Sequence, residues 1–174
     1  MYKRQKEDEL VLGINRAAET AAKEAGPVFW DAISGMSITD ANDILFGGID
    51  TAATTYLDNT TRPELFNNFE PKIETALSSV MVGNKSVVAE YESYVQEFNS
   101  ILNTSVPTGF TSTASLSSLM NVDTIAATDL SSYSTTKGLD GLFTKVKDEE
   151  KKIRVDPLHR VTEVLEKVFG ELDN

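Results

Sequence analysis

Three stretches of the sequence gather polar side chains of the kinds that bind ligands. In the first, Asn15 and Glu19 are four residues apart and so share one face of an expected helix, with Arg16 beside them. An arginine there could hold a carboxylate or a phosphate through two parallel hydrogen bonds. Arg16 and Glu19 could instead form ion pairs with other helices, which is the more ordinary use of such residues.

The second stretch follows Gly47-Gly48, where the backbone can approach a ligand closely because glycine has no Cβ. It places one carboxylate and several hydroxyl groups near one another: Asp50, Thr51, Thr54, Thr55 and Tyr56. The alternative is structural. The two glycines would end one helix, and Asp50 or Thr51 would cap the next.

The third stretch is densely charged and contains Lys137, Asp140, Glu149, Glu150, Arg154 and Asp156. Asp140 could pair locally with Lys137 or Lys147. Arg154 falls at an expected helix junction, where a buried arginine commonly binds a carboxylate or backbone carbonyls. The stretch therefore predicts either a solvated charged face with one junction salt bridge, or part of a ligand site.

The predicted ligand site combines residues from the three stretches, on the hypothesis that these stretches converge in the fold. Its candidate residues are Arg16, Glu19, Asp50, Thr51, Thr54, Tyr56, Lys137, Asp140 and Arg154.

A divalent cation could be bound only by carboxylates, with Asp40, Asp50, Asp140 and Glu149 as candidate ligands. The chain has no cysteine and one histidine, which excludes zinc–thiolate, iron–sulfur and multi-histidine sites. Neither Asp40 nor Asp50 begins the ligand pattern of a calcium-binding EF-hand. His159 has no nucleophile motif to accompany it. No catalytic residue and no cofactor are predicted.

Charge restricts the possible partners. The formal net charge of -11 opposes binding to nucleic acid, because such binding depends on cations that neutralise phosphates. It opposes an anionic membrane surface for the same reason, and leaves divalent cations, basic protein partners and small ligands. No apolar run approaches the roughly 20 residues that span a bilayer.

Hydrophobic residues recur at helical spacing and no alternating strand pattern competes with them. This predicts an all-α bundle of about eight helices in one domain over residues 1–174. The buried stripe of the first helix is expected to include Leu10, Ile14, Ala17 and Ala21. Gly26-Pro27 should end this helix at Ala25 and begin a short one reaching Ile33.

Later helices are expected over residues 41–46, 51–57, 87–102, 139–153 and 158–172. Thr61-Arg-Pro-Glu64 fits a capping box that opens a further helix, and Pro71 predicts a break near Glu70. Residues 103–123 are rich in serine and threonine. They are expected to form a long loop, either mobile or folded over the body through Phe110, Leu116 and Leu119.

Several blocks of the sequence resemble a bacterial family, the domain of unknown function 4197. They include ELVLGINRAAE at residues 9–19, DTAATTYL at 50–57, KGLDGLF at 137–143, EEKKIRVDP at 149–157 and KVFG at 167–170. Residues 36–41 and 65–71 and Tyr133 also match. The family-like blocks cover residues 9–102 and 129–172, in order. The resemblance implies an uncharacterised protein of the cell envelope or periplasm, usually made with a leader. Because MYKRQKEDEL does not read as a leader, a cytoplasmic protein is the alternative.

Three hypotheses of function follow. The first is a non-catalytic envelope protein that binds a partner protein or a small ligand. The second is a carboxylate-based, metal-dependent enzyme resembling a hydrolase, and the third is a structural subunit of a larger assembly. The sequence does not predict the oligomeric state.

Overall fold

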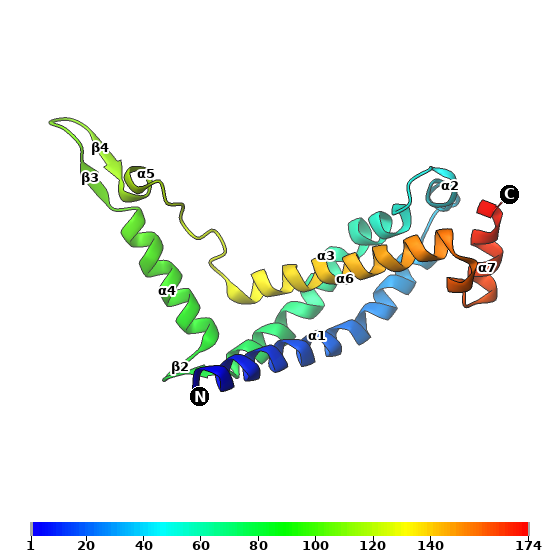
Figure 1. The fold of residues 1–174 in the computed structure, drawn as a ribbon, viewed down its shortest axis with the longest axis horizontal. Helices are drawn as coiled ribbons and strands as arrows, with labels where there is room; N and C mark the ends of the chain where they lie inside the picture. The colour runs from blue at the N-terminus through cyan, green and yellow to red at the C-terminus, as the bar shows by residue number, and fades with distance from the viewer. Residues whose placement is uncertain (1, 174) are drawn as a thin grey trace. The chain divides into compact units, whose positions relative to one another are not determined.

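The computed structural model describes the backbone of residues 2–173, and their side chains except at residues 2–10, 14, 17, 21, 164 and 173. Leu10, Ile14, Ala17 and Ala21, predicted to line the first helix, therefore have side chains outside the described residues. The seven α-helices of the described part are α1 (Tyr2–Ser34), α2 (Ile38–Phe46), α3 (Ala52–Ser78), α4 (Val87–Leu102), α5 (Leu116–Met120), α6 (Leu130–Val155) and α7 (Glu163–Phe169) (Figure 1). The helical fold class is confirmed broadly, with seven helices rather than about eight.

Two small antiparallel hairpins interrupt the helices, although the sequence predicts no strand. Strands β1 (Met81–Val82) and β2 (Lys85–Ser86) form the first hairpin, and β3 (Ser105–Pro107) and β4 (Thr113–Ser115) form the second. The first turns at Gly83, whose φ of 65° lies in the left-handed region that glycine adopts without strain. Strands of two or three residues are too short to show an alternating pattern.

The chain divides into two compact units. Unit 1 comprises Met1–Ala17 and Glu70–Ser134, and unit 2 comprises Ala18–Phe69 and Thr135–Asn174. Helices α1, α3 and α6 each contribute residues to both units. A single domain over residues 1–174 stays a prediction.

In unit 1, helix α4 anchors the segment that leads to α6. The Tyr91 hydroxyl donates to the carbonyl of Ala127 at 2.7 Å, and Asn99 exchanges two hydrogen bonds with the backbone of Ile125 at 2.8 and 2.9 Å. The expected loop at 103–123 is wrong in part, because it contains the second hairpin and α5. Phe110, which one of the two alternatives for this loop placed over the body, is fully exposed between the strands of that hairpin.

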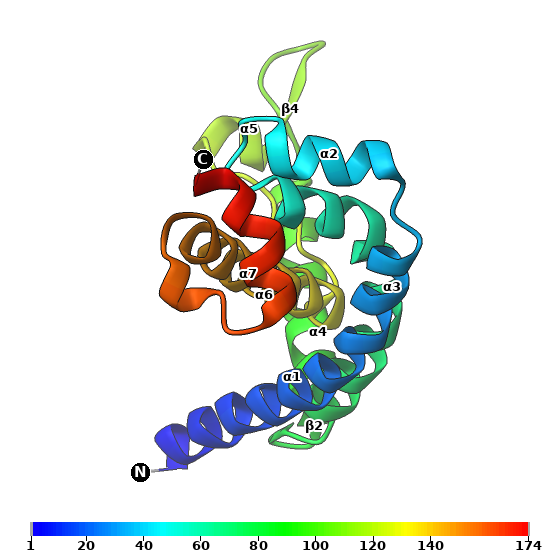
Figure 2. The same ribbon diagram turned by 90° about the vertical axis from the view of Figure 1, so that its right-hand side faces the viewer.

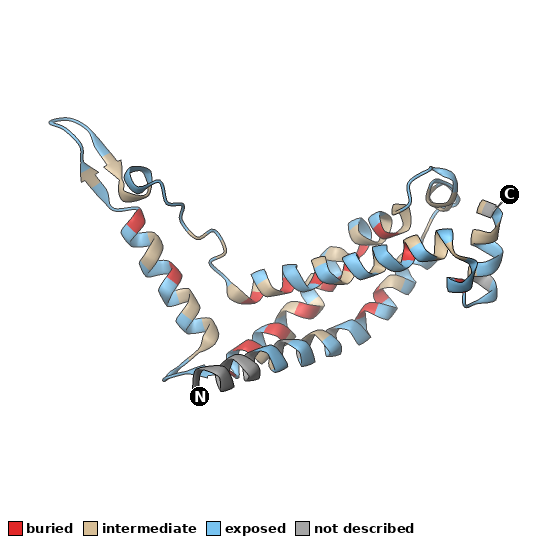
Figure 3. Cartoon of the chain, viewed as in Figure 1, coloured by how far each residue is buried: buried red, intermediate tan, exposed pale blue. Residues whose placement is uncertain are grey.

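In unit 2, segments of α1, α3 and α6 enclose the apolar core (Figures 2 and 3). The core side chains are Ala25, Val28, Leu65, Phe69, Leu139 and Phe143. Phe29 of α1 meets Phe143 of α6 edge to face, with ring centroids 6.0 Å apart. The core thus fixes α6 against the first half of α3, which is where the polar site lies.

Two predicted helix breaks, at Pro27 and near Glu70, are wrong, and each time packing outweighs the local signal. Helix α1 continues through Pro27, where the buried residues Ala25 and Val28 lie on either side. A proline inside a helix costs about 3 kcal/mol, an amount that two buried contacts can offset. Helix α3 also runs through Pro63 and Pro71.

The predicted cap at Thr61 is wrong for a related reason. Its side chain is buried, and its hydroxyl donates to the carbonyl of Leu57 at 2.7 Å inside α3. A threonine hydroxyl can make this bond to the preceding turn as readily as it can cap a helix. A cap does form at the start of α2, where Ser37 and Asp40 make a capping box.

The last predicted helix begins later than expected. Asp156 accepts a hydrogen bond from the amide of Leu158, but it opens a short 3-10 helix, η1 (Pro157–His159), which ends at Arg160. Helix α7 starts only at Glu163, with Thr162 as its cap, and a second 3-10 helix, η2 (Gly170–Asp173), follows. None of the described helices is long and apolar enough to cross a membrane.

Two glycines should respond oppositely to alanine. Gly141 lies inside α6 with open space around the position of a Cβ, so Gly141→Ala should raise the free energy of unfolding by about 0.5–1 kcal/mol. A Cβ at Gly47 would collide with the carbonyl oxygen of Asp43, so Gly47→Ala should lower the free energy of unfolding by about 1–3 kcal/mol. Urea denaturation measures both. Equal signs for the two variants would contradict this.

Candidate functional site

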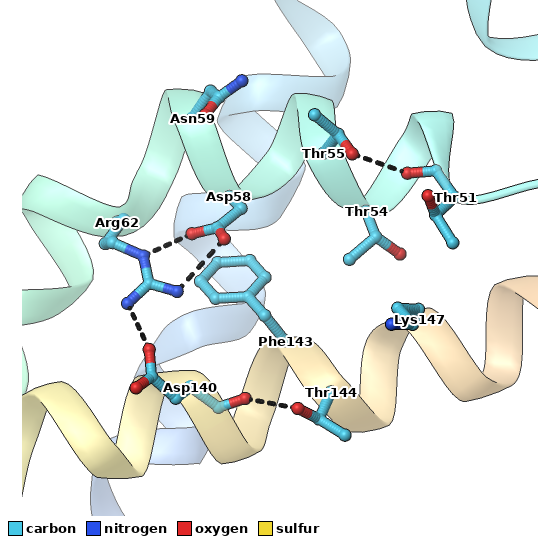
Figure 4. Close-up of a pocket in the computed structure, with 10 residues that line it drawn as sticks. All are labelled: Thr51, Thr54, Thr55, Asp58, Asn59, Arg62, Asp140, Phe143, Thr144 and Lys147. Carbon is cyan, nitrogen blue, oxygen red and sulfur yellow. Dashed lines mark hydrogen bonds and ion pairs between the residues drawn. The ribbon is translucent and has the colours of Figure 1, made fainter. Parts of the chain in front are cut away.

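A cavity of about 430 Å³ lies between the first half of α3 and the middle of α6, wholly within unit 2 (Figure 4). Its wall is polar except for one ring. It is lined by Thr51, Thr54, Thr55, Asp58, Asn59 and Arg62 of the α3 segment, and by Asp140, Phe143, Thr144 and Lys147 of α6. We call this cavity the α3–α6 groove.

Arg62 joins the two helices at one end of the groove. It binds Asp58 one turn earlier in α3 through both Nε and Nη2, and donates from Nη1 to Asp140 of α6 at 2.9 Å. Its guanidinium lies over the ring of Phe143, 5.1 Å from the centroid. Figure 4 shows the guanidinium between the two carboxylates, with the ring beside it.

These contacts favour the charged forms of Arg62 and Asp140. The hydrogen bond with Asp58 is the main cause that raises the pKa of Arg62, and the hydrogen bond from Arg62 is the main cause that lowers the pKa of Asp140. Lys137 also lowers the pKa of Asp140, because its Nζ lies 3.4 Å from the carboxylate oxygen Oδ2. Asp140 is therefore ionised at neutral pH and has no proton to give to a substrate.

Glu150 of α6 binds the amino-terminal end of α3 beside the groove. Its carboxylate accepts hydrogen bonds from the amides of Ala53 and Thr54 at 2.9 and 2.7 Å, and from the Thr54 hydroxyl at 2.6 Å. The same carboxylate pairs with Arg154, which also donates to the carbonyl of Ile44 at 2.7 Å. Glu150 thus fills the capping role that the sequence assigns to Asp50 or Thr51.

Burial acts to raise the pKa of Glu150, but the hydrogen bonds from Thr54 and Arg154 and from two backbone amides outweigh it and lower the pKa. Both side chains of the pair are nearly inaccessible, 5% exposed for Glu150 and 9% for Arg154. The predicted junction salt bridge of Arg154 is confirmed. Through Glu150 this salt bridge joins α6 to α3, and through Arg154 it joins α6 to the end of α2.

Three threonines of the groove have already used their hydroxyl protons. Thr54 donates to Glu150, Thr55 donates to the carbonyl of Thr51 at 2.9 Å, and Thr144 donates to the carbonyl of Asp140 at 2.7 Å. A hydroxyl that donates its one proton can offer a further partner only its lone pairs. These oxygens therefore act toward a ligand as acceptors.

The predicted site residues of unit 2 are partly brought together. Thr51, Thr54 and Asp140 line the groove, whereas Tyr56 lines a neighbouring cavity of about 240 Å³ with Asp40. The Tyr56 hydroxyl donates to the carbonyl of Ala32 at 3.1 Å.

The other candidates in this unit serve structural contacts. Asp50 forms an ion pair with Lys151 at 3.0 Å, Lys137 pairs with Asp140, and Arg154 pairs with Glu150. Glu19 is exposed on α1 and lines none of the described cavities. Arg16 belongs to unit 1, so its convergence with the other candidates stays a prediction.

The four carboxylates proposed as metal ligands have separate partners. Asp40 accepts hydrogen bonds from Ser37 in the α2 capping box, and Glu149 pairs with Lys152 at 2.7 Å. Asp50 and Asp140 pair with Lys151 and Arg62. Among the residues that the structure describes, no three histidine, aspartate or glutamate side chains form a group that could hold a metal ion.

The sequence overlooked Asp58, Asn59 and Arg62, and treated Lys147 only as a partner for Asp140. One signal was available for the first pair, because Asp58 and Arg62 are four residues apart, the spacing of neighbours on a helix face. The predicted helix end at Leu57 and the predicted cap at Thr61 assigned them to separate elements. Asp140 and Lys147 are seven apart, which places both on one face of α6. That Arg62 reaches across to Asp140 depends on the packing of α3 on α6.

Comparison with known proteins gives one match. Residues 2–170 match the model of the family described as "Protein of unknown function (DUF4197)". No curated protein and no solved structure matches the chain.

Proposed function

The chain belongs to this family of uncharacterised proteins, and from that premise we propose that it is a non-catalytic binding protein with a small-molecule site in the α3–α6 groove. The observation that carries the proposal is the groove itself. Its volume of about 430 Å³ falls within the range of small-molecule sites. Its polar groups come from two helices that a shared core holds together, so the groove exists before a ligand binds.

The chemistry of the groove favours binding over catalysis. Its two carboxylates, Asp58 and Asp140, are both bound by Arg62, which leaves neither free to act on a substrate or to ligate a metal ion. The metal-dependent hydrolase therefore has less support than a binding protein. The envelope or periplasmic location that the family resemblance implies is part of the same proposal, and cell fractionation would test it.

Blocking the groove should abolish binding whatever the ligand is. Asn59 lines the groove and is exposed, so Asn59→Trp should place an indole in the ligand space without disturbing the core. Asn67, also exposed on α3 but outside the groove, supplies the matched control Asn67→Trp. Ligand-observed NMR of the full chain against anionic, neutral and cationic small molecules should find binders whose affinity falls more than about tenfold in the first variant only.

Two outcomes would contradict the proposal. Binders that tolerate Asn59→Trp would have their site elsewhere in the molecule. A complete absence of binders across the three charge classes would remove the small-molecule function.

A further inference from the structure

We infer that the groove binds a small anion rich in hydroxyl groups, such as a sugar that carries one carboxylate or phosphate. This inference rests on the proposed function and adds the chemical class of the ligand. It follows from which charges of the groove are already neutralised, and from which hydrogen-bonding groups are still available.

Lys147 determines the charge of the ligand. The other charged side chains of the groove are mutually bound, since Arg62 pairs with Asp58 and Asp140 and Lys137 also pairs with Asp140. Lys147 makes no hydrogen bond or ion pair with any residue that the structure describes. An ammonium offers three donors and no acceptor, so its natural partner is an anionic oxygen.

The same argument disfavours a cationic ligand. A ligand ammonium would need an uncompensated carboxylate, but the charges of Asp58 and Asp140 are balanced by those of Arg62 and Lys137. It would also meet the charge of Lys147 along α6. The groove thus has a position for a negative charge and none for a second positive charge.

The threonine hydroxyls determine the rest of the ligand. Because Thr54, Thr55 and Thr144 have donated their protons to protein oxygens, they can only accept hydrogen bonds from a ligand. An ionised carboxylate has no proton to give, and a phosphate group near neutral pH has few. A ligand that forms hydrogen bonds with these three threonine oxygens must therefore supply the donors. Neutral hydroxyl groups do so without adding charge.

Arg62 complements these acceptors with donors. A guanidinium has five N–H groups, and three of them go to Asp58 and Asp140. The two that remain can donate to the oxygen of a ligand hydroxyl, as can the amide of Asn59, which lines the same groove. Donors and acceptors thus both line the groove, which matches a ligand with several hydroxyl groups, because each hydroxyl both donates and accepts.

Titration calorimetry of the full chain with defined probes tests the inference. Glucuronate carries hydroxyls and a carboxylate, glucose 6-phosphate carries hydroxyls and a phosphate, and glucose carries hydroxyls alone. Acetate and inorganic phosphate carry the matching anionic group without the sugar hydroxyls. At least one charged sugar should bind about tenfold more tightly than glucose and than the matching simple anion. Comparing the two charged sugars distinguishes a carboxylate from a phosphate ligand.

Two lysines of α6 give a matched pair of variants. Lys147→Ala should reduce the affinity for the charged sugar about tenfold and leave the affinity for glucose unchanged. Lys145, exposed on the same helix but outside the groove, should tolerate alanine with no loss.

The outcomes separate the inference from the proposed function. Tighter binding of a neutral or cationic molecule, blocked by Asn59→Trp, would overturn the inference and leave the groove as a binding site. Equal losses in the two lysine variants would also overturn it. If no molecule of any class shows binding that Asn59→Trp blocks, the proposed function fails with it.

Discussion

Glu150→Ala is expected to lower the free energy of unfolding by about 3–5 kcal/mol, the range found when one partner of a buried ion pair is removed. Glu150 is 5% exposed, and its carboxylate serves the amide of Ala53, the amide and hydroxyl of Thr54, and Arg154. Alanine would leave the Arg154 guanidinium buried without its carboxylate. It would also leave the first amides of α3 without acceptors.

The neighbouring residue supplies the control. Glu149 pairs with Lys152 at 2.7 Å, but both side chains are about half exposed, at 60% and 49%. An exposed pair of this kind contributes little, so Glu149→Ala should leave urea denaturation almost unchanged. Equal losses of stability in the two variants would show that the buried network does not hold α6 to α3.

Acid titration gives a second readout of the same network. The pKa of Glu150 is lower in the folded protein than its ordinary value of 4.5, so its contribution to stability is complete above that value. This contribution is lost as the pH falls from 4.5 through the lower folded pKa, because the unfolded state binds the proton more tightly than the folded state does. Glu150→Gln removes the titrating group, and its stability should therefore depend less on pH below about pH 4.5. A variant that follows the wild-type acid profile would contradict this assignment.

The sequence predicted the local elements better than the contacts that join them. Helix α4 was expected over residues 87–102 and has these bounds in the structure, with Val95 and Leu102 buried. The capping box of Ser37 was also predictable, because its partner Asp40 is only three residues away. Signals of this kind depend on neighbours in the chain.

The errors come from contacts across the chain. Glu150 caps α3 although it lies 96 residues from Thr54, and nothing near Thr54 in the sequence announces it. Pro27 and Thr61 carry local signals for a helix end and a helix start, yet buried residues beside them keep α1 and α3 continuous. A local preference of a few kcal/mol yields to packing that periodicity alone does not reveal.

The candidate site follows the same division: residues selected by their chemical type were found, and a residue whose role depends on helix packing was missed. Thr51, Thr54 and Asp140 were selected for their hydroxyl and carboxylate groups, and they line the groove. Arg62 was missed because its importance comes from reaching both Asp58 and Asp140, and only the packing of the two helices shows that.

The ring of Phe143, which lines the groove, should be another sensitive point of the fold. Phe143→Ala is expected to lower the free energy of unfolding by about 3–5 kcal/mol, because it removes a large buried side chain and leaves a cavity. Phe143 is 4% exposed, packs edge to face against Phe29, and lies beneath the guanidinium of Arg62. The substitution would also remove the surface on which Arg62 rests while it holds Asp58 and Asp140.

Two further variants separate packing from aromatic contact. Phe46 of α2 is 60% exposed, so Phe46→Ala should change the urea midpoint little. Phe143→Leu keeps an apolar side chain of useful size and should cost less than about 1.5 kcal/mol of packing, plus about 0.5–1.5 kcal/mol for the lost aromatic contact with Phe29. A Phe143→Leu variant as unstable as Phe143→Ala would mean that the ring contacts, rather than the filled volume, hold α6 to α1. A stable Phe143→Ala variant would mean that the groove has no rigid base, and the preformed site proposed for the ligand would then lose its structural support.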